Sequence, residues 1–581
     1  AGRGSSRRAT PTLRSRGPRA PSWRATTGYS IDTTRRAKMG LLPSFVFAAV
    51  AVATAGLYYS LLLFLDSVSE VHEYTAAQLG VAVGYGILLS IYAGAEAGFW
   101  VHHLQPKYSS VSEDEEEASA MQLVQEDGSS ASSPAPKPAG NIFFVKQELL
   151  PALRSAAEFV AIMGYIYVCD RTTLIAKGDK VQTKVGFWCV NALILLAGIF
   201  SLRQHKSADD VKPLQRDQTE EWKGWMQIMF VLYHYFAEAE IYNAIRLYIA
   251  AYVWMTGFGN FSYYYIKADF TILRFAQMMW RLNFFVFFVC VTMNNEYMLY
   301  YICPMHTFFT WLVYIALYAG HQFNKNDVLM VVKLLATVAV AVLLYDVPGT
   351  FHVVMSPFKF LLDFHDPLHP EFKDALHEWF FRSGLDHLVW VFGMFCAFHF
   401  PWFDRKFAGL EQLPAGQKFG AKLALAGATS AVFVWWLVTY FSLGKRDYNK
   451  VHPYTSFIPI YCYMILRNLT PTLRRWHMHL FAWTGKITLE TYILQFHIWM
   501  KTTGLNGSPK HLMVVLPGFY WTNFVLISAV YIFMSYRVFN ITNDLKNACI
   551  PHDTIGIFKA MAGAGAGLAV LYGAGAMLKG A

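Results

Sequence analysis

The chain has 581 residues, of which 55% are hydrophobic and 15% are charged, and its formal net charge is +10. Soluble domains contain roughly 45–50% apolar and about 25% charged residues, so this composition excludes an ordinary soluble enzyme and indicates a membrane protein. The basic residues lie at the ends of apolar runs and in an N-terminal tail, a pattern that is typical of membrane topology and argues against nucleic acid as a partner.

Residues 1–38 form a basic tail with nine Arg and a single acid, Asp32, amid Ser, Thr and Pro. Such a composition cannot bury a core, so we predict that the tail is disordered, as a transit peptide or as non-coding sequence that has been read through. Met39, just before the first apolar run, is the expected initiator.

Apolar runs close to the ~20 residues that cross a bilayer recur from residue 41 almost to the C-terminus. They predict an all-α polytopic membrane protein with roughly 13–15 transmembrane helices. Residues 39–202 contain the first of these helices and an acidic, Ser/Pro-rich loop at 104–140 that we predict to be disordered, and residues 546–581 form a Gly/Ala-rich tail. The expected spans are 41–64, 79–101, 150–168, 186–202, 223–239, 241–259, 281–302, 304–320, 327–346, 386–402, 421–443, 454–467, 481–500 and 512–535, with a further apolar run at 556–578.

Lys and Arg in short loops predict the orientation of the chain, because such loops stay in the cytosol. The loops at 65–78 and 348–385 carry more acids than bases and are predicted to be lumenal. The loops predicted to be cytosolic are 203–223, 262–281, 403–422 and 467–486. One loop disagrees, since 169–185 falls on the predicted lumenal side and contains Arg171, Lys177, Lys180 and Lys184.

The predicted span at 223–239 carries ionisable residues, which are expensive inside a bilayer and therefore usually functional. Lys223 and His234 are eleven residues apart, so an α-helix places them on one face about 16 Å apart, with Glu238 one further turn along. An imidazole can act there as a general base or as a transient acyl acceptor, and Glu238 would orient it. The structural alternative is a histidine that is hydrogen-bonded to a neighbouring helix.

Arg274 and Arg281 follow in the next segment, seven residues apart and therefore on one helix face. Guanidinium groups bind phosphate through two parallel hydrogen bonds and stay charged, so both residues are candidates for holding a phosphate-containing donor. The alternative is that they only mark a cytosolic helix end, where the positive-inside rule places basic residues.

The segment GKITLETYILQFHIWM, residues 485–500, repeats the eleven-residue spacing with Lys486 and His497. It also places Glu490 seven residues before His497, on the same helix face. We therefore expect a second polar track that faces the first, with Glu490 and His497 as secondary site candidates. The alternative is a coincidence of spacing with an interfacial Lys.

The predicted lumenal loop after residue 347 concentrates His and acidic side chains. It lacks the H-E-x-x-H spacing of a zinc site, and the seven cysteines of the chain form no CxxC pair, so we predict no metal. We expect an acceptor-binding or partner-docking surface, in which HEWFFRSGLD is a short helix that re-enters the membrane. In the structural alternative, Arg382 pairs with Glu378 or Asp386. The residues concerned are His352, His365, Asp366, His369, His377, Glu378, Asp386 and His387.

Several segments are similar to the acyltransferase-3 superfamily of membrane enzymes. The spacing of Lys223 and His234, G-F-G at 257–259 and the Arg274/Arg281 pair resemble its opening, although the superfamily has an Arg ten residues before the His. The chain resembles more closely the plant reduced wall acetylation family and its relatives, the capsule and sialic-acid O-acetyltransferases. The similar segments, within residues 217–540, are YHYFAEAEIYNAIRLYIAAYVWMTGFGNFSYYY, RFAQMMWRLNFF, YMLYYICPMHTFFT, LHEWFFRSGLDH and GKITLETYILQFHIWM.

This resemblance implies a membrane acyltransferase domain over residues 203–545 and acetyl transfer from cytosolic acetyl-CoA toward lumenal carbohydrate. It makes His234 the catalytic imidazole, and it makes Arg274 and Arg281, together with Lys223, candidates for holding the donor phosphates. The chain has no G-D-S motif, so it resembles the plant arrangement, in which separate lumenal acetyltransferases decorate the polysaccharide.

We therefore predict a Golgi or endomembrane O-acetyltransferase component that uses acetyl-CoA and no metal. Its expected acceptor is a cell-wall or secreted polysaccharide, reached directly or through separate lumenal acetyltransferases. The alternative is a transporter that moves acetyl-CoA or another acyl donor without covalent chemistry, its ionisable residues lining a permeation path. A scaffold for lumenal transferases is a third possibility.

Overall fold

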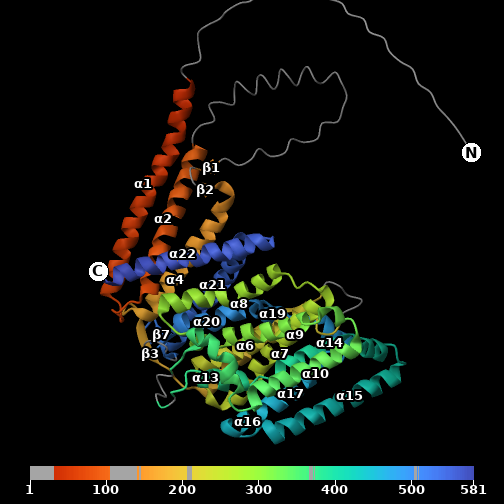
Figure 1. Ribbon diagram of the computed structural model, residues 1–581. Coiled ribbons are helices and arrows are strands. Elements are labelled where there is room, and N and C mark those ends of the chain that lie inside the picture. The colour runs from red at the N-terminus through yellow and green to blue at the C-terminus, as the bar shows by residue number, and fades with distance from the viewer. Residues whose placement is uncertain are drawn as a thin grey trace, which may run out of the picture.

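The computed structural model describes residues 32–104, 141–142, 145–205, 212–365, 371, 373–502, 507 and 509–580 (Figure 1). Within these ranges, eight helices are long and apolar enough to cross a membrane, and four shorter helices are also apolar. The predicted all-α polytopic class is confirmed. The long helices contain the spans Pro43–Ser67, Ala76–Val101, Gln147–Arg171, Ile272–Met293, Asp327–Asp346, Ala415–Phe441, Tyr520–Cys549 and Thr554–Gly580.

Three helices from the two ends of the chain pack together: α1 (Asp32–Ser67) on α2 (Ala76–Leu104), and α2 on α22 (Thr554–Gly580). Figure 1 shows α1 and α2 rising side by side beyond the bundle, with α22 crossing near their base. A Cβ added at Gly80 would lie 2.2 Å from the Leu571 carbonyl oxygen, and one at Gly575 would lie 2.0 Å from that of Ala76. Small residues therefore allow the Gly/Ala-rich tail to pack closely as a helix.

The N-terminal prediction needs one correction, because α1 begins at Asp32 and includes the end of the tail that we predicted to be disordered. Residues 1–31 and 105–140, which contain the rest of that tail and the acidic loop, lie outside the described residues. After them come β1 (Asn141–Ile142), β2 (Val145–Lys146), η1 (Gln147–Leu149), α4 (Leu150–Arg171) and α5 (Lys184–Phe200).

The remaining helices form one bundle around a continuous apolar core. α7 and α14 pack very closely, since a Cβ at Gly257 would lie 1.9 Å from the Trp390 carbonyl oxygen and one at Gly393 would lie 2.3 Å from that of Trp254. The G-F-G segment thus has a packing role at its first glycine. The main helices are α6 (Arg216–Tyr235), α7 (Tyr242–Lys267), α8 (Ile272–Met293), α9 (Ile302–Tyr318), α10 (Asp327–Asp346), α14 (Val389–Glu411), α15 (Ala415–Trp436), α16 (Lys445–Thr455), α17 (Phe457–Arg467) and α21 (Tyr520–Cys549).

Short elements connect these helices. They are η2 (Ala239–Ile241), η3 (Tyr297–Tyr300), η4 (His321–Phe323), α11 (Thr350–Met355), η5 (Ser356–Phe358), α12 (Lys359–Leu362), α13 (His377–Gly384), η6 (Leu437–Phe441), α18 (Pro471–Arg475), α19 (His479–Thr484), η7 (Gly485–Ile487), α20 (Thr488–Leu494) and η8 (Gln495–Trp499). Among them, η6 and η8 are π-helical turns, a rare conformation that is frequent at functional sites.

Two small antiparallel sheets tie distant segments together. In the first, with strand order β3-β7-β6, β3 (Ala176–Asp179) pairs with β7 (Pro509–Val514), and β7 pairs with β6 (Met500–Thr502). In the second, β4 (Leu202–Gln204) pairs with β5 (Trp476–Met478), so that Arg203 lies opposite His477. The first sheet lies on the predicted lumenal side and the second on the predicted cytosolic side.

Three predicted spans differ from the helices that form. The predicted helix at 281–302 ends at Met293, because Asn294 adopts a left-handed conformation with φ of 51°. The predicted helix at 481–500 is divided into α19, η7, α20 and η8. The run at 512–535 begins as a strand, and its helix starts at Tyr520. In each case the apolar pattern was recognised but the backbone turn within it was not.

The four basic residues of the loop at 169–185 all have structural partners. Lys177 pairs with Glu70 at 2.5 Å and Lys184 pairs with Glu240, while Arg171 lies 3.8 Å from Asp170. Lys180 donates to the carbonyl oxygen of His234 at 2.8 Å. These cations hold the predicted lumenal end of the bundle together, which gives this loop a structural use for basic residues.

The α7–α14 contact predicts opposite outcomes at two neighbouring glycines. In Gly257→Ala, the added Cβ collides with backbone, so we expect a loss of about 1–3 kcal/mol in the free energy of unfolding. Gly259→Ala is the matched control, since a Cβ there meets nothing within 4 Å, and helix propensity should make it neutral or mildly stabilising. Melting temperatures of both variants in detergent would check this; equal values would contradict the close approach.

Candidate functional site

His234 lies in the last turn of α6, where the helix ends at Tyr235. Its Nδ1 atom is 3.2 Å from Oε1 of Gln495, in the first residue of the π-helical turn η8. The ring of Phe230 meets the imidazole edge-on at 4.6 Å, and that of Phe496 lies 6.4 Å away. The imidazole is therefore half-buried, in an aromatic setting, with one defined polar partner.

The Gln495 contact determines which ring nitrogen of His234 is free. The amide nitrogen of Gln495 donates to the carbonyl oxygen of Tyr492 at 3.0 Å, so the amide oxygen must be the atom that faces His234. An oxygen accepts, and Nδ1 of His234 therefore carries the hydrogen. In a neutral imidazole this leaves the lone pair on Nε2, the nitrogen able to act as base or nucleophile.

Glu238 does not share the helix face that we predicted for it. α6 ends three residues before Glu238, and Ala237 turns the chain with a φ of 50°. The Glu238 carboxylate is buried, and within the described residues neither of its oxygens has a hydrogen-bond partner. The side chain in contact with the imidazole is Gln495, which the sequence interpretation missed although it lies in the quoted segment GKITLETYILQFHIWM.

α6 and α20 face each other across a polar seam, which we define as Lys223, Gln227, His234, Thr491 and Gln495. Gln227 Nε2 donates to Thr491 Oγ1 at 3.1 Å, and His234 meets Gln495 about two turns further along. The second polar segment contacts the first through Thr491 and Gln495. The residues of the repeated spacing lie elsewhere, since Glu490 pairs with Arg281 and His497 with Asp170.

Close backbone packing holds the cytosolic end of this seam. A Cβ at Gly224 would lie 1.8 Å from the Phe481 carbonyl oxygen, and one at Gly485 would lie 2.0 Å from that of Glu220. Glycines on both segments thus let α6 approach α19 and η7 closely enough for short polar side chains to meet.

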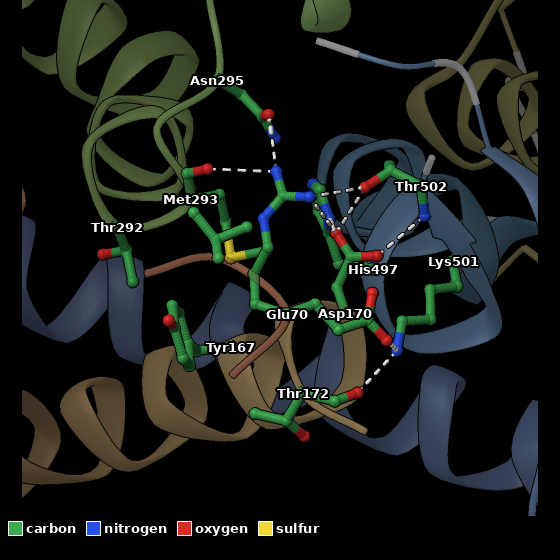
Figure 2. A network of polar contacts seen from close by, with 12 residues as sticks. Glu70, Tyr167, Asp170, Thr172, Thr292, Met293, Asn295, His497, Lys501 and Thr502 are labelled. Atoms are coloured by element: carbon green, nitrogen blue, oxygen red, sulfur yellow. Dashed lines mark hydrogen bonds and ion pairs between the residues drawn. The ribbon is translucent and has the colours of Figure 1, made fainter. Parts of the chain in front are cut away.

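His497 lies two residues after Gln495 and is completely buried. Its Nδ1 is 2.8 Å from Asp170 Oδ2, and its Nε2 is 2.5 Å from the Tyr300 hydroxyl. Asp170 also accepts from the backbone N–H and the hydroxyl of Thr502, at 2.7 and 2.8 Å. Figure 2 shows His497, Asp170 and Thr502 converging at the centre of this network.

Two cations complete the network around Asp170 (Figure 2). Arg171 donates to the Asn295 side chain at 2.8 Å and to the Met293 carbonyl oxygen at 3.0 Å. Lys501 donates to the Thr172 carbonyl oxygen at 2.7 Å and to Glu70 at 3.1 Å. Asp170 and Glu70 thus lie beside cations, with Arg171 next to Asp170 and both Lys501 and Lys177 on Glu70. We infer that this network fixes η8, and with it Gln495, against α4 and β6.

The predicted donor residues are all partnered. Lys223 pairs with Glu220 at 2.7 Å. Arg281 donates two hydrogen bonds to the buried carboxylate of Glu490, one of them at 3.0 Å. Glu220 is also within electrostatic range of Arg281, so the structure brings Lys223 and Arg281 to one patch.

Arg274 has a different environment on the same helix. Its guanidinium lies 4.3 Å from the centre of the Tyr263 ring, whose hydroxyl donates to Asp269 at 2.6 Å. The three cations therefore do not form a phosphate site that is free to bind. To contact Lys223 and Arg281, a phosphate would have to displace Glu220 and Glu490.

The loop after residue 347, predicted to be lumenal, forms a layer of short helices. The predicted helix at HEWFFRSGLD is α13, in which Arg382 pairs with Glu378 at 2.9 Å. Across the part of the chain that the structure describes, no three His, Cys, Asp or Glu side chains are grouped so as to hold a metal. Asp366 and His369 lie outside the described residues.

Residues 68–562 match the family model described as the 10 TM acyl transferase domain found in Cas1p. The chain belongs to this family. It is also 30% identical over 427 residues to the zebrafish (Danio rerio) protein named N-acetylneuraminate (7)9-O-acetyltransferase, a match that covers 71% of this chain and 52% of that protein. The chain thus spans about half the length of this curated relative. No solved structure matches the chain.

The family assignment widens the part of the chain that belongs to the acyltransferase. The match begins at residue 68, well before the boundary at 203 that we predicted, and so includes Asp170, Arg171 and Lys180. The ten spans in the family's description are fewer than the roughly 13–15 expected from apolar runs of the length that crosses a bilayer. Several of those runs form shorter apolar helices, such as α5, α9 and α17, so the number of spans stays a prediction.

The buried network predicts a large stability effect at Asp170. Asp170→Asn would leave Arg171 and His497 without their carboxylate, and we expect a loss of about 3–5 kcal/mol in the free energy of unfolding, because breaking a buried pair strands its partner. Melting temperature in detergent measures this. Glu240→Gln is the control, since its pair with Lys184 is exposed, and it should melt like wild type. Equal melting temperatures for both variants would contradict a structural role for the network.

Proposed function

We propose that this protein is a membrane O-acetyltransferase component that takes acetyl from acetyl-CoA at the cytosolic end of the polar seam and passes it, at His234, toward carbohydrate hydroxyls at the lumenal end. The family to which the chain belongs and the name of its zebrafish relative both support acyl transfer. The observation that carries the proposal is the His234–Gln495 hydrogen bond, which leaves Nε2 as the reactive nitrogen.

The chemistry follows from that nitrogen. Nε2 of His234 attacks the thioester carbonyl, the carbon–sulfur bond breaks, and the CoA thiolate leaves and takes a proton from water. The acetylated ring carries a positive charge, because Nδ1 keeps its hydrogen, and the Gln495 oxygen stabilises that charge. If no covalent intermediate forms, the same Nε2 takes the proton of the acceptor hydroxyl instead.

The donor is proposed to be acetyl-CoA, with its phosphates near Lys223 and Arg281. Lys223 lies eleven residues before His234 on α6, about 16 Å away, a distance that the extended pantetheine arm can span. Glu220 and Glu490 neutralise Lys223 and Arg281 in the absence of donor. Arg274, on its own contact with Tyr263, remains a candidate for a second phosphate.

The acceptor is proposed to be a cell-wall or other secreted polysaccharide in a Golgi-type compartment, as in the plant reduced wall acetylation family that the sequence resembles. The acetyl group is proposed to reach the polymer directly or through separate lumenal acetyltransferases, which are the proposed partners. The zebrafish relative is named for N-acetylneuraminate, so this sugar is a second acceptor to assay.

The first test is the reaction itself, with the acetyl and CoA portions of the donor labelled separately in reconstituted vesicles. We expect the acetyl label alone to reach the lumen, and His234→Ala to reduce CoA release by about 10²–10⁴-fold. Gln495→Leu should reduce it less, because the imidazole remains but loses its orientation. His399→Ala is the control, since this histidine contacts only its own helix, at the Phe395 carbonyl oxygen. Passage of both labels together, unaffected by His234→Ala, would indicate a transporter.

The second test concerns the donor patch. Lys223→Met should raise KM for acetyl-CoA about tenfold with little change in kcat, because it removes a ground-state charge contact. Glu220→Gln should lower KM, since it removes the anion with which the phosphate competes. Lys406→Met, an equal charge change at an exposed lysine of α14, should leave KM unchanged. An unaltered KM in all three variants would place the donor elsewhere.

A further inference from the structure

A second buried polar cluster lies apart from the network around His497. It consists of Arg246 near the start of α7, Asp386 just before α14, and His452 in α16. Arg246 Nη2 is 3.2 Å from Asp386 Oδ2, and His452 Nε2 is 3.4 Å from Asp386 Oδ1. The three residues are only 4%, 0% and 0% exposed, so three separate elements bring charge into the interior at this point.

Several polar atoms of this cluster have no hydrogen-bond partner among the described residues. They are Arg246 Nε, Asp386 Oδ1 and His452 Nε2, and Nε2 of the adjacent His387. Buried polar groups without partners cost about 1–3 kcal/mol each. A position where several such atoms lie together is therefore suited to bind a polar group. The Asp386–His452 contact at 3.4 Å is an ion-pair distance that forms no hydrogen bond.

The hydrogen-bond partner on the other side of the His452 ring indicates which kind of group the cluster could bind. Nδ1 of His452 is 3.1 Å from the Tyr448 hydroxyl. When Nδ1 donates to that hydroxyl, Nε2 and Asp386 Oδ1 are both acceptors and face each other with no hydrogen between them. Arg246 Nε beside them is a free donor. A hydroxyl group fits this arrangement, because it donates one hydrogen and accepts another.

The cluster and His234 lie at the same end of the bundle. α6 ends at Tyr235 and α7 begins at Tyr242, so His234 and Arg246 lie at the adjoining ends of two packed helices. Tyr233, next to His234, is within electrostatic range of Arg246. In Figure 1, α13 and α16 lie toward the same left-hand end of the bundle as β3 and β7, which is the predicted lumenal end.

We propose that Arg246, Asp386 and His452 form the acceptor site, in which a sugar hydroxyl binds and is deprotonated. The proposal rests on the proposed acetyl transfer. The hydroxyl oxygen attacks the acetyl carbon, the bond from that carbon to Nε2 of His234 breaks, and the new ester bond forms. The hydroxyl proton moves to His452 Nε2, His234 returns to its neutral form, and the proton later leaves to the lumen. Arg246 orients the hydroxyl, and Asp386 stabilises the charge on His452.

The test separates the two halves of the reaction in the full-length protein. CoA release from acetyl-CoA without acceptor reports the donor half. Transfer of acetyl label to N-acetylneuraminic acid or to xylotetraose reports the acceptor half. In His452→Gln and in Asp386→Asn, we expect CoA release within twofold of wild type and transfer reduced at least about 100-fold. Lys450→Gln, at an exposed residue of α16, should keep both halves.

Melting temperatures in detergent distinguish function from folding. Variants that melt like wild type but lose only transfer support an acceptor site. If both variants melt early and lose both halves together, the cluster is a structural ion pair, and the proposal is overturned. Transfer at the wild-type rate in either variant overturns it as well. A wild-type protein that releases no CoA would instead refute the proposed function on which the acceptor site depends.

Discussion

The geometry of the site depends on one constraint, the anchoring of a π-helical turn inside the bundle. Residues Gln495–Trp499 replace the regular helix after α20, and His497 within this turn is held by Asp170 and Tyr300. That anchor determines where Gln495 lies, and Gln495 in turn determines which nitrogen of His234 is free. A network with hydrogen bonds from several separate elements is a suitable support, because each contact restricts the movement of the others.

Buried charges of the bundle lie beside opposite charges. Asp170 and Glu70 lie among Arg171, Lys177 and Lys501 at the predicted lumenal end, and Glu220 and Glu490 pair with Lys223 and Arg281 near the predicted cytosolic end. Buried ions require this, since an unpaired charge costs several kcal/mol. Within the described residues, the Glu238 oxygens and several atoms around Asp386 are among the buried polar atoms that have no hydrogen-bond partner. Glu238 lies four residues after His234, at the end of the bundle where transfer to an acceptor is proposed.

Much of the fold could be predicted from the sequence, and less of the site. Apolar runs gave the helices because crossing a bilayer sets their length and composition. The repeated spacing pointed to the segment that contacts α6, but the contacts are made by Thr491 and Gln495 and not by the Glu490 and His497 that the spacing singled out. The Glu238 prediction was wrong because helical spacing holds only while the helix lasts, and Ala237 ends it with a left-handed turn. Asp170 and Gln495 were not recognised, since a contact across more than two hundred residues leaves no periodic signal in one sequence.

The proposed donor patch is connected to His234 through one short segment of the chain. Arg281 of α8 is paired with Glu490 of α20, and Glu490 lies five residues before Gln495 in the same short segment. A phosphate that exchanged with Glu490 would free the anchor of α20 on the cytosolic side, while the Asp170–His497 contact kept η8 fixed on the lumenal side. Any strain from donor binding would then fall on the residues between these two anchors, which include Thr491 of α20 and Gln495 of η8, both hydrogen-bonded to α6. In the proposed function, the Arg281–Glu490 pair therefore contributes to the positioning of His234 as well as to the recognition of the donor.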